Sequence, residues 1–216
     1  MLRKLLMSLA IGQAACGVAQ AEQGDFLVRL RGIVVAPTES SSGVTPAFPD
    51  GRVGVDNAVV PELDFTYFIT DNIAAELILA TSPHDLIGEG TLDGLGKIAD
   101  TMVLPPTLTF QYHFNPRGQI DPYVGVGINY TVFYSEDASS ALNNAIGQTS
   151  VDVDDSVGVA FQAGVDYALT ERWFLNADIK YIQIDTTGTL NTGGAINRVD
   201  VDLDPIVAGL GFGYRF

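Results

Sequence analysis

The last eight residues of the chain, Gly209-Leu210-Gly211-Phe212-Gly213-Tyr214-Arg215-Phe216, decide the fold class. Successive side chains of a β-strand point to opposite faces, so Leu210, Phe212, Tyr214 and Phe216 would form one apolar face opposite three glycines and an arginine. A soluble protein that exposed such a strand would aggregate readily. The outer face of a membrane barrel, by contrast, is apolar and carries aromatic girdles. We therefore expect the closing strand of a transmembrane β-barrel; the last strand of a soluble sandwich is the alternative.

The N-terminus is typical of an exported protein. Residues 1–4 include two basic side chains, residues 5–11 form an apolar run, and Ala19-Gln20-Ala21 is a small-residue cleavage site. We predict that residues 1–21 are a signal peptide and that residues 22–216 form the mature domain. Cys16 is the only cysteine and lies in this signal, so no disulfide is expected; acylation of Cys16 in a lipoprotein is the alternative. No later segment approaches the roughly 20 apolar residues of a membrane-spanning helix.

The composition suits one β-rich domain of low charge. The chain has 23 glycines, 47% hydrophobic residues and 17% charged residues. Its net charge of −15 argues against nucleic acid or an anionic lipid surface as a partner. Acidic external loops would tolerate a lipopolysaccharide layer bridged by divalent cations. The glycines at positions 88, 90, 94 and 96 lack the strand-turn-helix setting of a phosphate-binding loop, so we expect no cofactor there.

Apolar side chains alternate with polar ones in eight segments, and the connections between them alternate in length. The long connections are residues 37–56, 84–100, 135–156 and 188–198, whereas residues 70–72, 115–118 and 170–172 form short turns. This pattern predicts an all-β, eight-stranded, antiparallel, up-and-down barrel whose long loops are extracellular. The expected strands are residues 26–36, 58–69, 73–81, 103–114, 122–134, 157–169, 173–186 and 199–216. We also expect a bulge at residues 182–184, a phase shift at Asp204-Pro205 and a short helix within residues 138–146.

The face opposite the aromatics carries charges, which excludes a soluble barrel with a dry apolar interior. These inward charges come from several strands and can pair across the lumen, so we predict an ion-pair plug in preference to an ion-conducting path. Its members are Arg29, Arg31, Glu62, Asp64, Glu76, Asp166 and Lys180. Four glycines on the same face either leave a crevice or allow close strand approach: Gly125, Gly127, Gly158 and Gly164.

Several motifs together resemble the OmpW family of small outer-membrane proteins, over nearly the whole mature domain. They are Thr70-Asp71-Asn72-Ile73, Leu104-Pro105-Pro106-Thr107, Gln111-Tyr112-His113-Phe114, the segment from Pro122 to Tyr130, Gly164-Val165-Asp166-Tyr167, Asp185-Thr186-Thr187, Asp204-Pro205 and Gly213-Tyr214-Arg215-Phe216. The resemblance implies a narrow, partly apolar channel for small hydrophobic molecules, of which the alkane-uptake relatives are the clearest example. The expected partners are outer-membrane lipid, lipopolysaccharide and small hydrophobic solutes.

The alternating, Phe-terminated end also resembles the signal that the bacterial outer-membrane assembly machinery reads. We assign that role to Leu210, Phe212, Tyr214 and Phe216.

Two other functions compete with a channel. A lipid-modifying barrel enzyme needs a nucleophile within reach of a base, but His84 and His113 are expected at opposite ends of the barrel, and the cluster of Ser82, His84 and Asp85 is local to one loop. A structural or adhesive barrel would act through its loops. Two acidic clusters are interpreted as a solvated rim in preference to calcium sites, so no metal is expected: Asp152, Asp154 and Asp155, and Asp200, Asp202 and Asp204.

Pro105 and Pro106 interrupt a segment that otherwise alternates as a strand. Proline has no amide hydrogen to donate, and a closed barrel has no free edge at which that loss is harmless. The pair therefore predicts either a local opening in the barrel wall, through which a solute leaves sideways, or a bulge that shapes the barrel rim.

Overall fold

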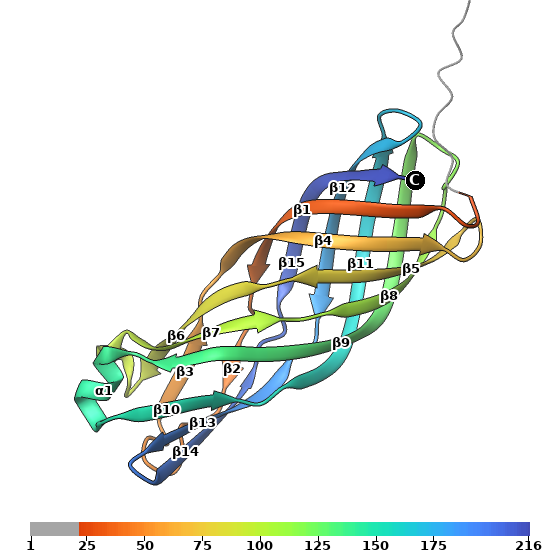
Figure 1. Cartoon of the computed structure of the whole chain (residues 1–216). Helices are drawn as coiled ribbons and strands as arrows, with labels where there is room; N and C mark the ends of the chain where they lie inside the picture. Colours follow the sequence, from red (N-terminus) through yellow and green to blue (C-terminus); the bar gives the residue numbers. More distant parts are fainter. Residues whose placement is uncertain (1–21) are drawn as a thin grey trace, which may run out of the picture.

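The computed structural model describes residues 22–216 and shows a closed eight-stranded antiparallel barrel (Figure 1). Neighbouring strands follow the order β11-β12-β15-β1-β4-β5-β8-β9, and β9 pairs with β11 to close the wall. The predicted signal peptide and Cys16 lie outside the described residues. The barrel strands are β1 (Phe26–Ala36), β4 (Ala58–Phe68), β5 (Ile73–Ala80), β8 (Thr107–His113), β9 (Ile120–Ala138), β11 (Ser156–Ala168), β12 (Trp173–Ile182) and β15 (Ile206–Arg215).

The C-terminal segment is a barrel strand, as its alternation predicts. β15 pairs with β1 from Leu27–Arg215 to Ala36–Ile206, and with β12 on its other side. Phe216 extends this seam, because its amide donates to the carbonyl of Phe26 at 3.0 Å. The strand thus has no free edge.

The outside of the barrel is an apolar belt. Leu210 is 71% exposed and Phe216 is 70% exposed, and the apolar positions of the other barrel strands are exposed in the same way. Aromatic rings cluster where the strands end near the C-terminus, with Trp173 and Phe216 each lying edge-on to Tyr214. This polarity matches a barrel in lipid and is opposite to that of a soluble barrel. No helix among residues 22–216 is long and apolar enough to cross a membrane.

The end of the barrel with the long connections, here called the loop end, differs from the sequence prediction. Its connections are not simple loops, because most of their residues continue the wall as strands beyond the belt (Figure 1). β9 is followed laterally by β7, β6 and β3, and a second sheet has the order β10-β13-β14-β2. The added elements are β2 (Ser40–Ser41), β3 (Gly51–Val55), β6 (Ser82–Gly90), the 3₁₀ turn η1 (Asp93–Leu95), β7 (Lys97–Leu104), α1 (Ser140–Ile146), β10 (Thr149–Val153), β13 (Asp185–Thr192) and β14 (Ala195–Asp202).

Three predicted strands are also divided. Residues 103–114 break at Pro105-Pro106 into β7 and β8, residues 173–186 break after Ile182, and residues 199–216 break before Ile206. The last two breaks are the places where the blurred phase predicts irregularity. Asp204 has a φ of 36°, so the chain turns there and passes from the loop-end sheet to the barrel wall. The predicted helix is confirmed but starts later, with the Ser139 side chain accepting from the amide of Leu142.

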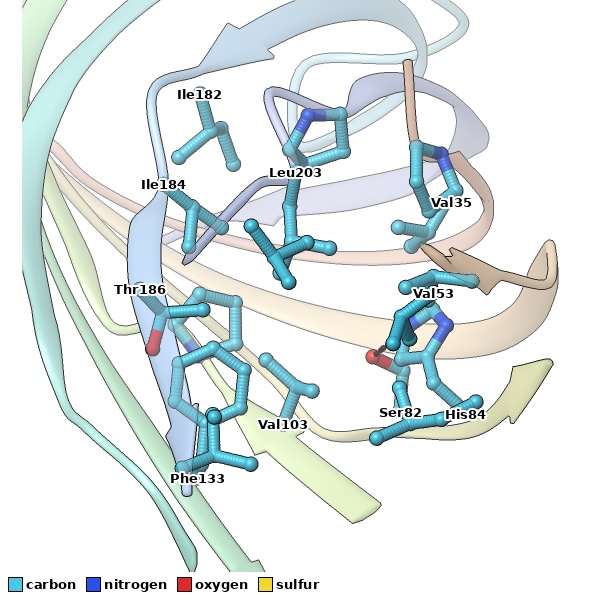
Figure 2. A pocket seen from close by; sticks show the side chains of 18 of the residues that line it. Val35, Val53, Ser82, His84, Val103, Phe133, Ile182, Ile184, Thr186 and Leu203 are labelled. Carbon is cyan, nitrogen blue, oxygen red and sulfur yellow. Dashed lines mark hydrogen bonds between the residues drawn. The ribbon is translucent and has the colours of Figure 1, made fainter. Parts of the chain in front are cut away.

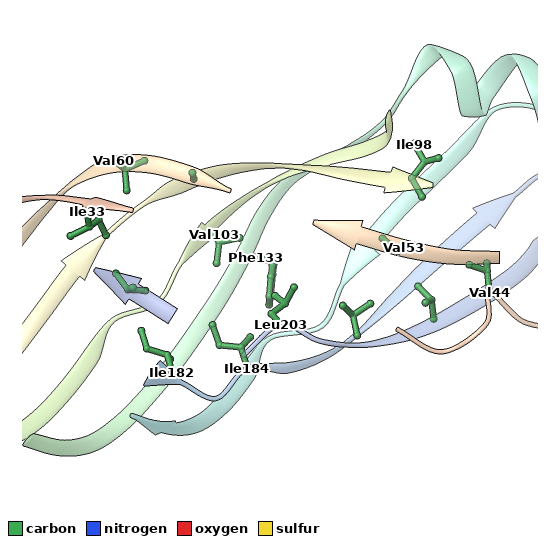
Figure 3. Close-up of a cluster of buried hydrophobic side chains, with 14 of the residues drawn as sticks. Ile33, Val44, Val53, Val60, Ile98, Val103, Phe133, Ile182, Ile184 and Leu203 are labelled. Carbon is green, nitrogen blue, oxygen red and sulfur yellow. The ribbon is translucent and has the colours of Figure 1, made fainter. Parts of the chain in front are cut away.

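The interior has three layers, which the inward residues of β1 show in order. Leu27 belongs to a small apolar cluster with Phe68, Ala74 and Phe174 at the short-turn end. Arg29 and Arg31 come next and are fully buried. Ile33 then joins a larger apolar cluster that fills the loop end (Figure 3). A charged layer therefore separates two apolar ones.

Candidate functional site

The loop end contains an apolar cavity (Figure 2). The cavity adjoins the charged layer, because Glu62, which pairs with Arg31, is among its lining residues. The centre of a water-sized molecule can move through about 90 Å³ of it. Glu62, Ile78 and Thr107 line its floor side, where the barrel wall meets the charged layer. Aliphatic and aromatic side chains from the barrel and the loop-end strands form most of its wall, among them Ile33, Val53, Val103, Phe133, Ile184 and Leu203. Such a lining suits a small hydrophobic molecule.

Ser82 and His84 form a polar pair in this mostly apolar wall. Both side chains are buried and point inward from β6, and Ser82 Oγ lies 2.9 Å from His84 Nε2 (Figure 2). His84 Nδ1 lies 2.9 Å from the backbone oxygen of Asp56. The predicted cluster of Ser82, His84 and Asp85 is therefore only partly right. Asp85 faces away and binds Lys97 Nζ at 2.7 Å, because adjacent residues of a strand point to opposite sides.

The seven predicted plug residues lie together in one buried network, placed there by β1, β4, β5, β11 and β12. Arg29 contacts Glu76 at 2.9 Å and Asp166 at 2.8 Å. Arg31 contacts Glu62 at 2.9 Å and Asp64 at 2.7 Å. Lys180 contacts Glu62 at 2.7 Å. Paired in this way, the charges can remain buried.

Asp178 is a further member that the sequence prediction left out of the network. It lies 2.8 Å from both Arg31 and Lys180. Its position two residues before Lys180 on the same strand face was the available signal. Asp178 also accepts from Gln162, which accepts from Gln111, so amide side chains extend the network toward the short-turn end.

His113, Asp121 and Asp166 are the described residues whose ligand atoms lie close enough together for a metal ion. They already bind one another or neighbours. His113 Nδ1 lies 2.7 Å from Asp121, Asp166 accepts from Arg29 and Asn176, and Asp121 also accepts from the amide of Asn115. The three residues therefore form part of the hydrogen-bonded packing between the plug and the short-turn end of the barrel.

The inward glycines allow close approach, so the crevice interpretation fails at three of the four. A Cβ at Gly164 would lie 2.4 Å from the ring of Tyr123, and one at Gly158 would lie 2.0 Å from the carbonyl oxygen of Gln183. A Cβ at Gly127 would lie 2.1 Å from the carbonyl oxygen of Leu108. These positions are occupied by neighbours and leave no open space.

Pro105 and Pro106 lie at an interruption in the wall on one side only. Toward β5 and β6, the pairing stops at Ile78–Thr107 and resumes at Ser82–Val103, and no backbone pair joins residues 79–81 to 104–106 within the described chain. Toward β9, the carbonyl of Pro106 accepts from the amide of Tyr130 at 3.1 Å. Because amides alternate sides along a strand, Pro105 is the position that lacks a donor toward β5 and β6. Pro105 also lines the cavity.

The acidic clusters serve partly as structural acceptors. Asp155 accepts from the hydroxyl of Tyr130 at 2.7 Å, and Asp204 accepts from the hydroxyl of Tyr181 at 2.8 Å. Asp204 also accepts from the amide of Ile184. It therefore does not continue the exposed face of Asp200 and Asp202, because the chain turns before it.

A family model described as the OmpW family matches residues 22–216. The chain belongs to the OmpW family. Outer membrane protein W of Salmonella typhimurium is 39% identical, over 97% of both chains. The crystal structure of the outer membrane protein OprG from Pseudomonas aeruginosa has a TM-score of 0.85 at 35% identity and covers 92% of this chain and 99% of its own. A protein named for the dibenzothiophene metabolism operon, PahQ of Pseudomonas aeruginosa, is 32% identical, over 78% of this chain and 76% of its own.

As an OmpW-family barrel, the chain is an outer-membrane protein of a Gram-negative bacterium. The family resemblance predicted from sequence is therefore confirmed. The cavity itself was not predicted residue by residue, since over a third of its lining residues, among them Val53, Ile98 and Val151, lie in segments that the sequence suggested were loops. The available signal was the alternation of Val199, Val201 and Leu203.

Proposed function

We propose that this OmpW-family barrel passes small hydrophobic molecules across the outer membrane, from the loop end into its apolar cavity and then sideways into the membrane. The observation that carries the proposal is the order of the interior layers: an apolar cavity lies above a floor of buried ion pairs. We infer a transport role in preference to a catalytic or adhesive one. The PahQ relative, whose name refers to the metabolism of an aromatic hydrophobe, supports a hydrophobic solute.

A hydrophobic solute gains from such a route because the lipopolysaccharide leaflet is polar and cross-linked. In the cavity, apolar surface is removed from water at a gain of about 25 cal/mol per Å². Passage straight through the barrel would require the solute to separate buried charge pairs such as Arg31–Asp64. Breaking one such pair costs about 3–5 kcal/mol. The floor therefore directs the solute away from the lumen.

The interruption beside Pro105 is the proposed exit. Pro105 lines the cavity and the interruption lies in the barrel wall, so a solute that left there would pass from an apolar lining into lipid. Thr81 and Tyr134 share a hydrogen bond of 2.7 Å, which links the two sides of this region and would have to open or be bypassed.

Lipid, lipopolysaccharide and the assembly machinery are the partners that we propose for the outer surface and the C-terminal strand.

Uptake of radiolabelled nonane by Gram-negative cells with an intact lipopolysaccharide layer tests the proposal. Cells that produce the protein should take up nonane faster than cells with an empty vector, and they should gain no comparable rate for a polar solute of similar size. Equal nonane uptake by both strains, with the barrel properly assembled, would refute the channel.

Replacing Pro105 and Pro106 with valine tests the exit. The new amide at position 105 supplies a donor toward β5 and β6, so the wall should tighten and nonane uptake should fall while assembly stays normal. The single variant Pro106→Val is the matched control, because its new amide faces β9, where the strands are already paired. Unchanged uptake in the assembled double variant would leave the prolines a shaping role only.

A further inference from the structure

We propose that Ser82 and His84 form a hydrogen-bond acceptor site that selects hydrophobic solutes carrying a hydroxyl group, such as aliphatic alcohols and phenols, over the matching hydrocarbons. This inference rests on the proposed function and names the class of solute that the cavity favours. It concerns a polar pair in a mostly apolar wall, beside the interruption at residues 104–106.

The hydrogen bonds of His84 define its proton position. The backbone oxygen of Asp56 only accepts, so the Nδ1 atom of His84, 2.9 Å away, must carry the proton. In the neutral ring Nε2 is then an acceptor, and it receives the hydroxyl proton of Ser82 across 2.9 Å. The amide of Asp56 donates to the carbonyl of Asp85 at 3.3 Å, which ties the segment that carries this acceptor to β6.

Ser82 therefore presents a lone pair and no proton to the cavity. Its only hydroxyl hydrogen is engaged by His84, and no other partner of Oγ is found among residues 22–216. Ser82 is buried and lines the cavity, so water reaches it poorly when a solute fills the space. A solute with a hydroxyl hydrogen can donate it to this lone pair of Ser82, whereas a hydrocarbon or an ether has no hydrogen to donate.

Ser82 and His84 lie beside the proposed exit, so a solute that binds them is placed where it can leave the cavity. Ser82 is the first residue of the β6–β7 pairing after the unpaired stretch and is matched with Val103 across the strands. A solute that moves toward Pro105 passes it. Apolar side chains of the wall, such as Ile33, Phe133 and Leu203, offer the solute contact without hydrogen bonds. Three other polar lining residues have partners in the protein: Glu62 pairs with Lys180, Thr107 donates to the carbonyl of Pro105, and Thr186 donates to the carbonyl of Asp154.

Three solutes of nine heavy atoms separate the hydrogen-bond roles: 1-octanol donates and accepts, methyl heptyl ether only accepts, and nonane does neither. At pH 8, cells producing the wild-type protein should take up 1-octanol with the largest gain over empty-vector cells. Ser82→Ala should lower that gain by roughly three- to tenfold, the effect of one net hydrogen bond, and leave nonane and the ether unchanged. Ser150→Ala, at an exposed serine of β10, is the matched control.

His84→Leu adds a test of the mechanism, because it releases the hydroxyl hydrogen of Ser82. The ether should then gain relative to nonane, a change that loss of packing alone would not produce. Equal wild-type uptake of all three solutes, with no effect of Ser82→Ala on 1-octanol, would overturn the acceptor site while leaving the channel intact.

Binding is tested separately by nitrogen NMR of the histidine rings, with the full barrel in lipid nanodiscs. The chain has two histidines, so His113 serves as the internal reference. 1-Octanol should shift the Nε2 signal of His84 and spare that of His113, and nonane should shift neither. This result would support the site even if uptake failed, and equal responses to 1-octanol and nonane would overturn it.

Discussion

Lys180→Met is the substitution whose effect on stability follows most directly from the charged layer. The Lys180 side chain is 1% exposed and lies 2.7 Å from Glu62 and 2.8 Å from Asp178. Methionine keeps most of the apolar stem but removes the charge, so two carboxylates lose a buried partner. Breaking a buried pair in this way costs about 3–5 kcal/mol. We expect the free energy of unfolding of the barrel to fall by that amount.

Lys97→Met is the matched control. Lys97 also contacts two carboxylates, Asp85 at 2.7 Å and Asp100 at 3.5 Å, but its side chain is 41% exposed. Solvent screens such a pair, so the substitution should change the stability little. The two lysines differ mainly in burial, and the comparison isolates that property.

Urea unfolding in lipid vesicles measures both variants. Trp173 is the only tryptophan and lies 47% exposed in the apolar belt, so its fluorescence reports the insertion of the folded barrel in lipid. Adding Glu62→Gln to Lys180→Met should recover part of the loss, because one uncompensated carboxylate is removed. Similar losses in Lys180→Met and Lys97→Met, or an additive double variant, would refute the reasoning.

Two further predictions concern the barrel ends. Deleting Phe216 should reduce assembly in the outer membrane, measured by the folded fraction in isolated membranes, and should leave refolding in detergent largely intact; if neither changes, the assembly signal is wrongly assigned. Lys97 should titrate above an ordinary lysine, because its hydrogen bond to Asp85 stabilises the charged form and raises the lysine pKa. The bond should therefore contribute below the unfolded-state pKa and be lost as the pH rises through the folded-state pKa; NMR of methylated lysines checks this, and an unchanged titration in Asp85→Asn would contradict it.

The transmembrane strands could be predicted from the sequence because lipid imposes a simple rule. Each strand needs an apolar outer face, and this two-residue period is visible without knowledge of its neighbours. The period weakens beyond the belt, where both faces of a strand can be polar. The segments containing β6 and β13 therefore looked like loops, and their pairing became visible only in the structure.

The candidate site could also be predicted from the sequence only in part. Alternation places Arg31 and Lys180 inside the barrel, and burial of both signs requires pairing. Alternation also places Asp178 inward, two residues before Lys180, but it does not show which strands face one another across the lumen, so the contacts of Asp178 with Arg31 and Lys180 became visible only in the structure. The sequence indicated the pair of Ser82 and His84 but not the second partner of His84. That partner, the Asp56 backbone oxygen, comes from a distant segment and has no side-chain signature.

Photo-crosslinking with a diazirine analogue of nonane tests the proposed route most directly. Cells with an intact lipopolysaccharide layer would be exposed to the analogue, illuminated, and the labelled residues of the purified barrel mapped by mass spectrometry. Crosslinks to inward-facing residues report solute inside the barrel, whereas crosslinks to belt residues report solute dissolved in the surrounding lipid. We expect labels on cavity residues such as Val103, Leu203 and Pro105, and none on Gln111 or Tyr123 beneath the charged layer. Labels on Gln111 and Tyr123 would show that the solute passes straight through the lumen and would contradict the lateral route.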